Sequence, residues 1–117
     1  MGHLSTHVLD TVRGKPAAGV AIRLYACQGK ERRLVKSITT NADGRTDAPL
    51  LSGNDFAVGI YELVFGAGDY HRAQGHQLPS PPFLDEVVIR FGVADSSVNY
   101  HVPLLLSPYS YSTYRGS

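Results

Sequence analysis

The chain has 117 residues and a formal net charge of +1 with neutral histidines, and 43% of its residues are hydrophobic. These values are typical of one folded globular unit, so we expect residues 1–117 to form a single domain. The basic residues are scattered along the chain, which argues against nucleic acid or an anionic membrane as a partner, because both need a clustered basic face.

The chain begins with a pattern of period two. In residues 3–10 (HLSTHVLD) the side chains divide between two faces, with Leu4, Thr6 and Val8 on one and Ser5, His7 and Leu9 on the other. Such alternation predicts a β-strand that packs one face against a core.

The segments that follow predict an all-β fold. Residues 40–45 (TNADGR) predict a tight turn, because Asn, Asp and Gly tolerate left-handed backbone. Residues 66–77 (GAGDYHRAQGHQ) break the alternation and hold the one short helix that we expect. Runs rich in β-branched and aromatic residues predict further strands at 20–27, 32–40, 58–65, 86–93, 99–106 and 109–114.

Roughly seven or eight short strands at even spacing predict an antiparallel β-sandwich. We see no internal repeat and no linker that would divide the chain. A sandwich of this kind has open sheet edges, and open edges tend to find partners, so oligomerisation is expected from the architecture alone.

Polar side chains near the C-terminus fall on one face of their strands. Residues 99–106 (NYHVPLLL) direct alternate apolar side chains to the core and leave the opposite face to His101, Pro103 and Leu105. Residues 109–114 (YSYSTY) form a similar face from Ser110, Ser112 and Tyr114. Faces that mix His, Ser or Tyr with apolar residues are typical of a contact surface or a cavity.

The five histidines need separate interpretations. His7 and His101 lie on predicted strands among apolar neighbours, where a hydrogen-bonded structural role and acid–base catalysis are both open. His3, His71 and His76 lie near a terminus or in the irregular segment, and we expect them to be solvated. No short-spaced His or Cys motif accompanies them, so we expect no metal site.

Arg45 follows Gly44 in the predicted turn. It is either a solvated turn residue or a fixed cation at a loop tip, where ligand-binding groups often lie. Its guanidinium suits the carbonyl or enolate oxygens of a heterocycle. The chain has neither a G-x-S-x-G nucleophile elbow nor a phosphate-binding glycine loop, so spacing alone names no reaction.

Cys27 is the only cysteine, and an intrachain disulfide is therefore impossible. No signal peptide or membrane-length apolar segment is visible in the sequence. We therefore expect a protein of the reducing cytoplasm.

Whole stretches of the sequence, rather than single residues, point to a family. STHVLDTVRGKPA, TNADGR, PFLDEVVIRF and HVPLLLSPYSYSTYRGS resemble the 5-hydroxyisourate hydrolases, the transthyretin-related proteins, and YRGS is the most specific part. The resemblance implies a transthyretin-like β-sandwich of about eight strands with one short helix. It also implies a homotetramer with active sites at the dimer–dimer interface, no cofactor, and ring-opening hydrolysis of 5-hydroxyisourate to 2-oxo-4-hydroxy-4-carboxy-5-ureidoimidazoline in urate breakdown.

The resemblance also implies site residues. The implied catalytic residues are His7, Arg45, His101 and Ser117, and the implied substrate-binding residues are His7, Arg45, Tyr114, Arg115 and Gly116. A histidine would activate water and the arginine would stabilise the developing anion, and which histidine is the base stays open. Asn99 differs from many relatives, which carry His or another polar residue at this position. The difference concerns the fine tuning of the site and not the assignment to the family.

Two other functions remain open at this stage. The transthyretin fold also carries thyroid hormone, so a small-ligand binding protein is an alternative, although two histidines and an arginine suit an apolar iodinated ligand poorly. A structural module without chemistry is the other alternative, and it predicts that replacing His7 or Arg45 changes no measurable property.

Overall fold

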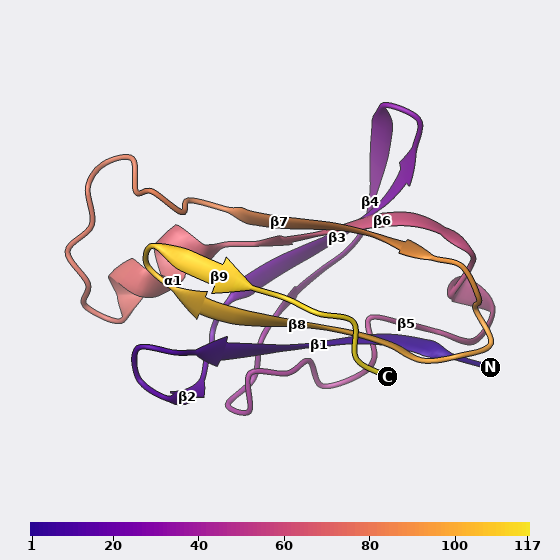
Figure 1. The fold of residues 1–117 in the computed structure, drawn as a ribbon, viewed down its shortest axis with the longest axis horizontal. Coiled ribbons are helices and arrows are strands. Elements are labelled where there is room, and N and C mark those ends of the chain that lie inside the picture. The colour runs from indigo at the N-terminus through magenta and orange to yellow at the C-terminus, as the bar shows by residue number, and fades with distance from the viewer.

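The computed structural model describes residues 1–117 as two β-sheets packed face to face, with a short helix at one end (Figure 1). Sheet A contains β1 (His3–Asp10), β2 (Lys15–Pro16), β5 (Leu51–Ser52), β8 (Tyr100–Ser107) and β9 (Ser110–Ser112). Sheet B contains β3 (Ala21–Gln28), β4 (Glu31–Thr39), β6 (Gly59–Phe65) and β7 (Val87–Val93). Helix α1 spans Ala67–Ala73, and a 3-10 turn, η1, spans Gly53–Asp55.

The predicted fold class, a β-sandwich with one short helix, is confirmed. The strand order is β2-β1-β8-β9 in sheet A, where β5 also pairs with β1, and β4-β3-β6-β7 in sheet B. Strands β2 and β5 were not predicted, because two residues each leave no period in the sequence. The strand predicted at 109–114 is shorter than expected and ends at Ser112.

One strand pair departs from the antiparallel expectation. Strands β1 and β8 run parallel, in continuous register from Leu4 opposite Tyr100 to Asp10 opposite Leu106, whereas every other named pair is antiparallel. Opposed residues of neighbouring strands lie on the same face of a sheet. The outward face of β1 therefore continues directly into the outward face of β8.

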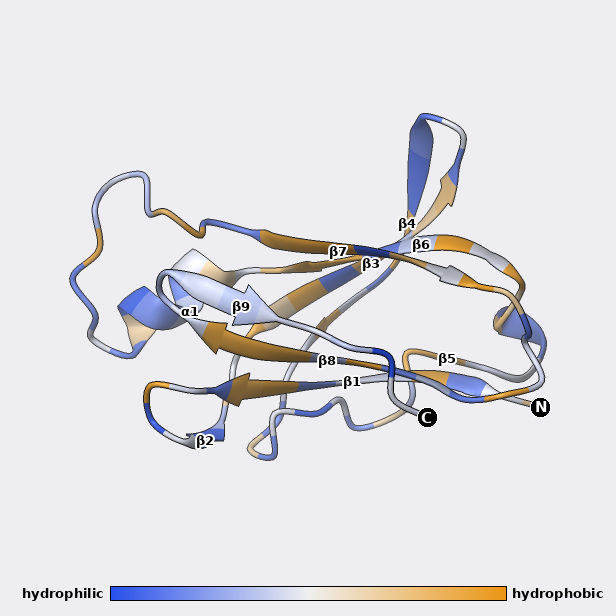
Figure 2. Cartoon of the chain, viewed as in Figure 1, coloured by the Kyte–Doolittle hydropathy of each residue, from blue (hydrophilic) through white to orange (hydrophobic).

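The core fills the space between the sheets, and its residues follow the predicted alternation. Apolar colour is concentrated on the long strands, whereas the turn between β3 and β4 is strongly polar (Figure 2). On β1 every second residue is buried, and on β8 the alternate apolar positions are buried as predicted. The side chains without exposed surface include Leu4 and Val8 of β1, Leu104 and Leu106 of β8, and Leu63 and Phe65 of β6.

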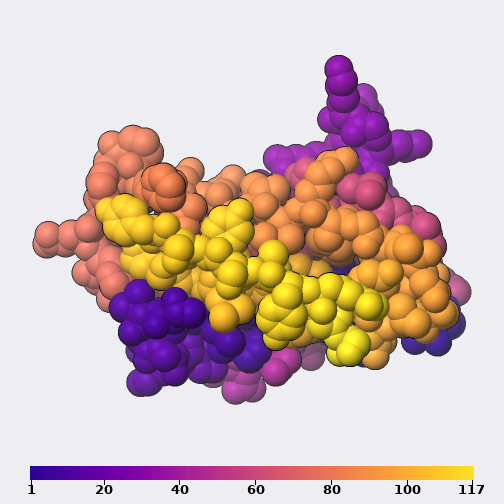
Figure 3. Space-filling model, in the orientation of Figure 1, coloured from indigo at the N-terminus to yellow at the C-terminus, as the bar shows by residue number.

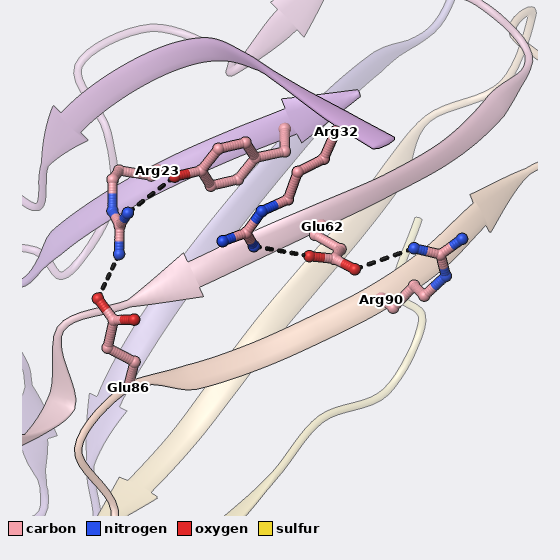
Figure 4. Close-up of polar contacts among 6 residues, drawn as sticks. Arg23, Arg32, Glu62, Glu86 and Arg90 are labelled. Atoms are coloured by element: carbon pink, nitrogen blue, oxygen red, sulfur yellow. Dashed lines mark hydrogen bonds and ion pairs between the residues drawn. The ribbon is translucent and has the colours of Figure 1, made fainter. Parts of the chain in front are cut away.

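The outward face of sheet B carries a network of charged residues that pair with one another (Figure 4). Glu62 on β6 accepts hydrogen bonds of 2.9 Å from Arg32 on β4 and from Arg90 on β7. Arg23 on β3 pairs with Glu86 just before β7. These pairs link the strands of sheet B and largely neutralise one another, so this face offers no converging unpaired groups.

Helix α1 is anchored to the end of β1 by a buried carboxylate. Asp10 has 1% exposure and accepts a 2.7 Å hydrogen bond from the Tyr70 hydroxyl. The same side chain accepts backbone hydrogen bonds from Val12 at 3.0 Å and Arg13 at 3.1 Å. Despite the burial of this carboxylate, these hydrogen bonds hold its pKa below the ordinary value.

The expectation that His71 is solvated is wrong. His71 has no exposed surface, and its ring packs edge-on against Tyr70 and His76 with centroid distances of 5.4 and 5.6 Å. Neither ring nitrogen has a hydrogen-bond partner within the protein. Burial lowers the pKa of His71, and His76 also lowers it, while the carboxylate of Asp10 and the backbone carbonyl of Ser107, which lies near the ring without forming a hydrogen bond of ordinary geometry, oppose the shift. His3 and His76 are partly exposed.

His71 should therefore make the fold acid-sensitive. Because the folded-state pKa lies below the ordinary value of 6.5, the unfolded chain takes up this proton first, and stability falls as the pH drops below 6.5. We expect urea unfolding to give a lower free energy at about pH 5.5 than at about pH 7.5, and His71→Phe to reduce that difference. His3→Asn serves as the control, and an unchanged pH difference in the His71 variant would contradict the expectation.

Candidate active site

Two predicted site histidines lie on the outward face of sheet A. The register of β1 and β8 sets Ser5 opposite His101 and His7 opposite Pro103, so these residues form one continuous patch. Both histidines are half-buried. The patch exists because the buried positions of β1 and β8 are apolar or hydrogen-bonded, which forces the intervening residues outward.

The turn at residues 41–45 attaches Arg45 beside this patch. The Asn41 side-chain oxygen accepts hydrogen bonds from the backbone amides of Asp43 at 2.9 Å and Arg45 at 3.2 Å. Gly44 has a φ of +73°, and its carbonyl accepts a 2.8 Å hydrogen bond from the Val8 amide. A Cβ on Gly44 would stand 2.3 Å from the Val8 carbonyl oxygen, so only glycine permits this approach to β1.

Arg45 is within electrostatic reach of both imidazoles. Burial lowers the pKa of His7, the Arg45 guanidinium lowers it further, and the backbone carbonyl and charge of Asp43 oppose the shift. Burial also lowers the pKa of His101, with Arg45 and then His7 as further causes. Both imidazoles are therefore mostly neutral at pH 7, which is the form that can accept a proton.

The ring of His101 is fixed on two sides. Its Nδ1 lies 2.8 Å from the Ser5 hydroxyl oxygen. Its backbone forms an antiparallel bridge with Gly116, through hydrogen bonds of 2.7 and 3.2 Å. A Cβ on Gly116 would lie only 3.1 Å from both Cβ and Cδ2 of His101, so the tail backbone lies directly against the imidazole.

Further contacts hold the C-terminal tail along β8 (Figure 3, yellow). The Thr113 hydroxyl donates to the Pro103 carbonyl at 2.7 Å. The Arg115 guanidinium lies 4.3 Å from the centre of the Tyr100 ring and donates to the Asn99 carbonyl at 3.1 Å. The Asn99 side chain in turn accepts a hydrogen bond from the backbone amide of His3, so Asn99 links the tail segment to β1.

Within one chain the structure brings together only some of the predicted site residues. His7, Arg45, His101 and Gly116 form one group. Tyr114 is 61% exposed and lies toward β7, in a groove with Phe91, and Ser117 is exposed. The Arg115 guanidinium is engaged by Tyr100 and Asn99.

Sequence reasoning assigned no role to Ser5, although alternation had placed it on the same face as His7. Only the register between β1 and β8 reveals that it contacts His101. Thr113 was missed because nothing in the local pattern shows that its hydroxyl reaches β8.

The patch is open in a single chain. A shallow cleft of about 190 Å³ adjoins it, lined by His3, Ser5, Arg45 and the loop at residues 46–49. No cavity includes both His7 and His101. The structure shows no group of three or more His, Cys, Asp or Glu side chains able to hold a metal ion. None of its helices has the length and apolar character needed to cross a bilayer.

Comparison with known proteins gives one consistent family. The family model described as HIUase/Transthyretin family matches residues 4–116. A 5-hydroxyisourate hydrolase of Mesorhizobium japonicum is 64% identical over 116 residues, which cover 99% of this chain and 93% of that protein.

Two solved structures show the same fold. The crystal structure of (S)-allantoin synthase has a TM-score of 0.94 and 45% identity, over 99% of this chain and 44% of that one. Sea bream transthyretin in complex with thyroxine has a TM-score of 0.86 and 28% identity, over 97% of this chain and 93% of that one.

Removal of Arg45 should raise the pKa of both site imidazoles. A positive charge disfavours a second positive charge nearby, so Arg45→Ala should move the NMR-monitored titrations of His7 and His101 to higher pH. Arg33→Ala, which removes a cation from β4 that forms no ion pair, should leave both titrations in place. Equal titrations in the wild type and the Arg45 variant would show that the guanidinium does not act on the imidazoles.

Proposed function

The chain belongs to the HIUase/transthyretin family, and on this premise we propose that it is a 5-hydroxyisourate hydrolase that opens the substrate ring with water activated by a histidine. The observation that carries the proposal is the gathering of two imidazoles of lowered pKa and one guanidinium on a single face. The product is 2-oxo-4-hydroxy-4-carboxy-5-ureidoimidazoline.

The proposed reaction is the hydrolysis of a cyclic amide bond. A neutral imidazole removes a proton from water, and the oxygen of that water bonds to a ring carbonyl carbon. Negative charge then builds on the carbonyl oxygen. When this intermediate collapses, the ring C–N bond breaks, the nitrogen takes up a proton, and a carboxylate forms. General-base assistance of this kind contributes roughly 10²–10⁴-fold to the rate.

Arg45 is proposed to stabilise the developing anion. Its guanidinium carries a positive charge and presents several donors in one plane, which suits an oxygen that gains negative charge. A donor aimed at such an oxygen contributes roughly 3 kcal/mol when water is excluded. The turn that docks on Val8 supports this role because it holds Arg45 beside His7 rather than in open solvent.

We also propose that the active unit is a homotetramer with sites where dimers meet, as in the family. In this arrangement Tyr114, Arg115 and Ser117 of the tail, which do not meet the imidazoles within one chain, would line a site formed by several copies. The exposed edges of β7 and β9 and the open patch on sheet A support this arrangement. Covering the patch would exclude water and strengthen the interactions of Arg45.

The alternative is a binding protein like transthyretin. The likeness to a transthyretin structure shows that the fold alone does not separate the two functions. The chemistry of the patch favours hydrolysis, because two neutral imidazoles beside a cation provide a proton acceptor and an anion partner. An apolar iodinated ligand needs neither.

The proposal is tested by the ultraviolet absorbance of freshly generated 5-hydroxyisourate. The wild-type protein should speed the loss of absorbance over the spontaneous decay, and His7→Ala and Arg45→Ala should each reduce kcat/KM by about a hundredfold. Arg33→Ala is the matched control and should retain full activity. A wild-type protein that does not exceed spontaneous decay would rule out the function. A dilution series adds a check on assembly, because specific activity should fall where copies dissociate.

The contact between the tail and His101 gives a separate test. Gly116→Ala should push the tail away from the imidazole, because the new Cβ would lie 3.1 Å from both Cβ and Cδ2 of His101. We expect kcat/KM to fall roughly ten- to hundredfold while the far-ultraviolet circular dichroism spectrum is unchanged. Gly66→Ala is the control, since its Cβ would meet Ala21 at an ordinary 3.6 Å. Equal activity of the two variants would show that the position of the tail does not matter.

A further inference from the structure

The hydroxyl of Ser5 contacts a histidine of the proposed site, although the proposed reaction assigns no role to this hydroxyl. Its oxygen lies 2.8 Å from Nδ1 of His101, and no other side-chain hydrogen bond forms at Ser5. The two residues stand opposite each other in the parallel register of β1 and β8, so two packed strands fix their spacing. Gly116 covers the Cδ2 side of the same ring.

We propose that Ser5 is a positioning residue that donates its hydroxyl proton to Nδ1 of His101 and so holds this imidazole as the tautomer with a proton on Nε2. His101 then presents an N–H donor to the substrate, and His7 is left as the base that activates water. Assigning these two roles deepens the proposed function and rests on it. The state of the ring in the free protein does not depend on the reaction.

The side-chain partners available favour this direction of the hydrogen bond. A serine hydroxyl has one proton to donate, and in this structure the only side-chain acceptor that it reaches is Nδ1 of His101. A neutral imidazole carries one proton, so an Nδ1 that accepts leaves the proton on Nε2. Arg45 and burial favour the neutral ring, in which this choice between tautomers arises.

The surroundings of His7 complement this assignment. Burial and then Arg45 lower the pKa of His7, which favours the neutral ring. A neutral imidazole keeps a lone pair on one nitrogen, which is what a general base needs. The Ser5 contact therefore distinguishes His101, the donor, from its neighbour His7, the base.

The tautomer can be measured directly on the free protein. Ring ¹⁵N chemical shifts of His101, recorded where the ring is neutral, should show the proton on Nε2 in the wild type. In Ser5→Ala the same resonances should move toward a mixture of tautomers, and the pKa of His101 should rise because a donor to the neutral form is lost. Ser37→Ala, at an exposed serine of β4, should change neither measurement. A wild-type His101 with its proton on Nδ1 would overturn the assignment.

Kinetics separate positioning from a merely structural role. Ser5→Ala should lower kcat roughly tenfold with KM changed by less than about twofold, because the donor is misplaced in the transition state while the base, His7, is untouched. Ser5→Thr, which keeps the hydroxyl, should restore most of the activity. Ser5→Ala with wild-type kcat, or Ser5→Thr with the activity of Ser5→Ala, would overturn the proposal. If the wild type itself lacks activity, the function fails while the ¹⁵N measurement still decides the role of Ser5.

Discussion

The site depends first on the parallel pairing of β1 with β8. If a strand slips by one residue, all of its outward-facing side chains turn toward the core. The buried side chains must therefore fix the register. Leu4 and Val8 on β1 are fully buried, as is Leu104 on β8. The Thr6 hydroxyl also donates to the Val102 carbonyl at 2.7 Å within the core. The same packing that stabilises the sandwich therefore fixes the spacing of the outward residues between these positions.

Two glycines then bring separate segments to this face. Gly44 lets the turn that carries Arg45 approach the backbone of β1, and Gly116 lets the tail approach His101. In both places a Cβ would collide or crowd, so the contacts are made by backbone atoms. Backbone contacts hold a segment more firmly than long side chains do, because fewer rotatable bonds lie between the anchor and the group that acts. A guanidinium on an exposed turn is thus kept within electrostatic reach of both imidazoles.

Much of the fold was predictable because its signals are local. Alternation of apolar and polar side chains predicted the long strands, and the backbone preferences of Asn41 and Gly44 predicted the turn. The parallel pairing of β1 with β8 was not predictable from period, since it joins segments almost a whole chain apart. The prediction for His71 was wrong because a helix of only seven residues shows no clear helical period in the sequence, so its buried face could not be identified. The faces of His7 and His101 could be read from alternation, but their chemistry came from the family resemblance, and the contact of Ser5 required the register.

In the proposed reaction, Arg45 couples the protonation of the imidazole base to the negative charge that develops on the substrate. Before substrate reacts, burial and then the guanidinium lower the pKa of both imidazoles, which favours the neutral form that can accept a proton. When negative charge develops on the substrate beside Arg45, that charge offsets the guanidinium, and the imidazole that has just taken a proton is no longer disfavoured to the same degree. The same cation thus favours the neutral imidazole before the proton transfer from water, and it disfavours the imidazolium less strongly after that transfer. This effect weakens in water of high dielectric constant, which gives a physical reason for an open patch of this kind to function where other copies of the chain cover it.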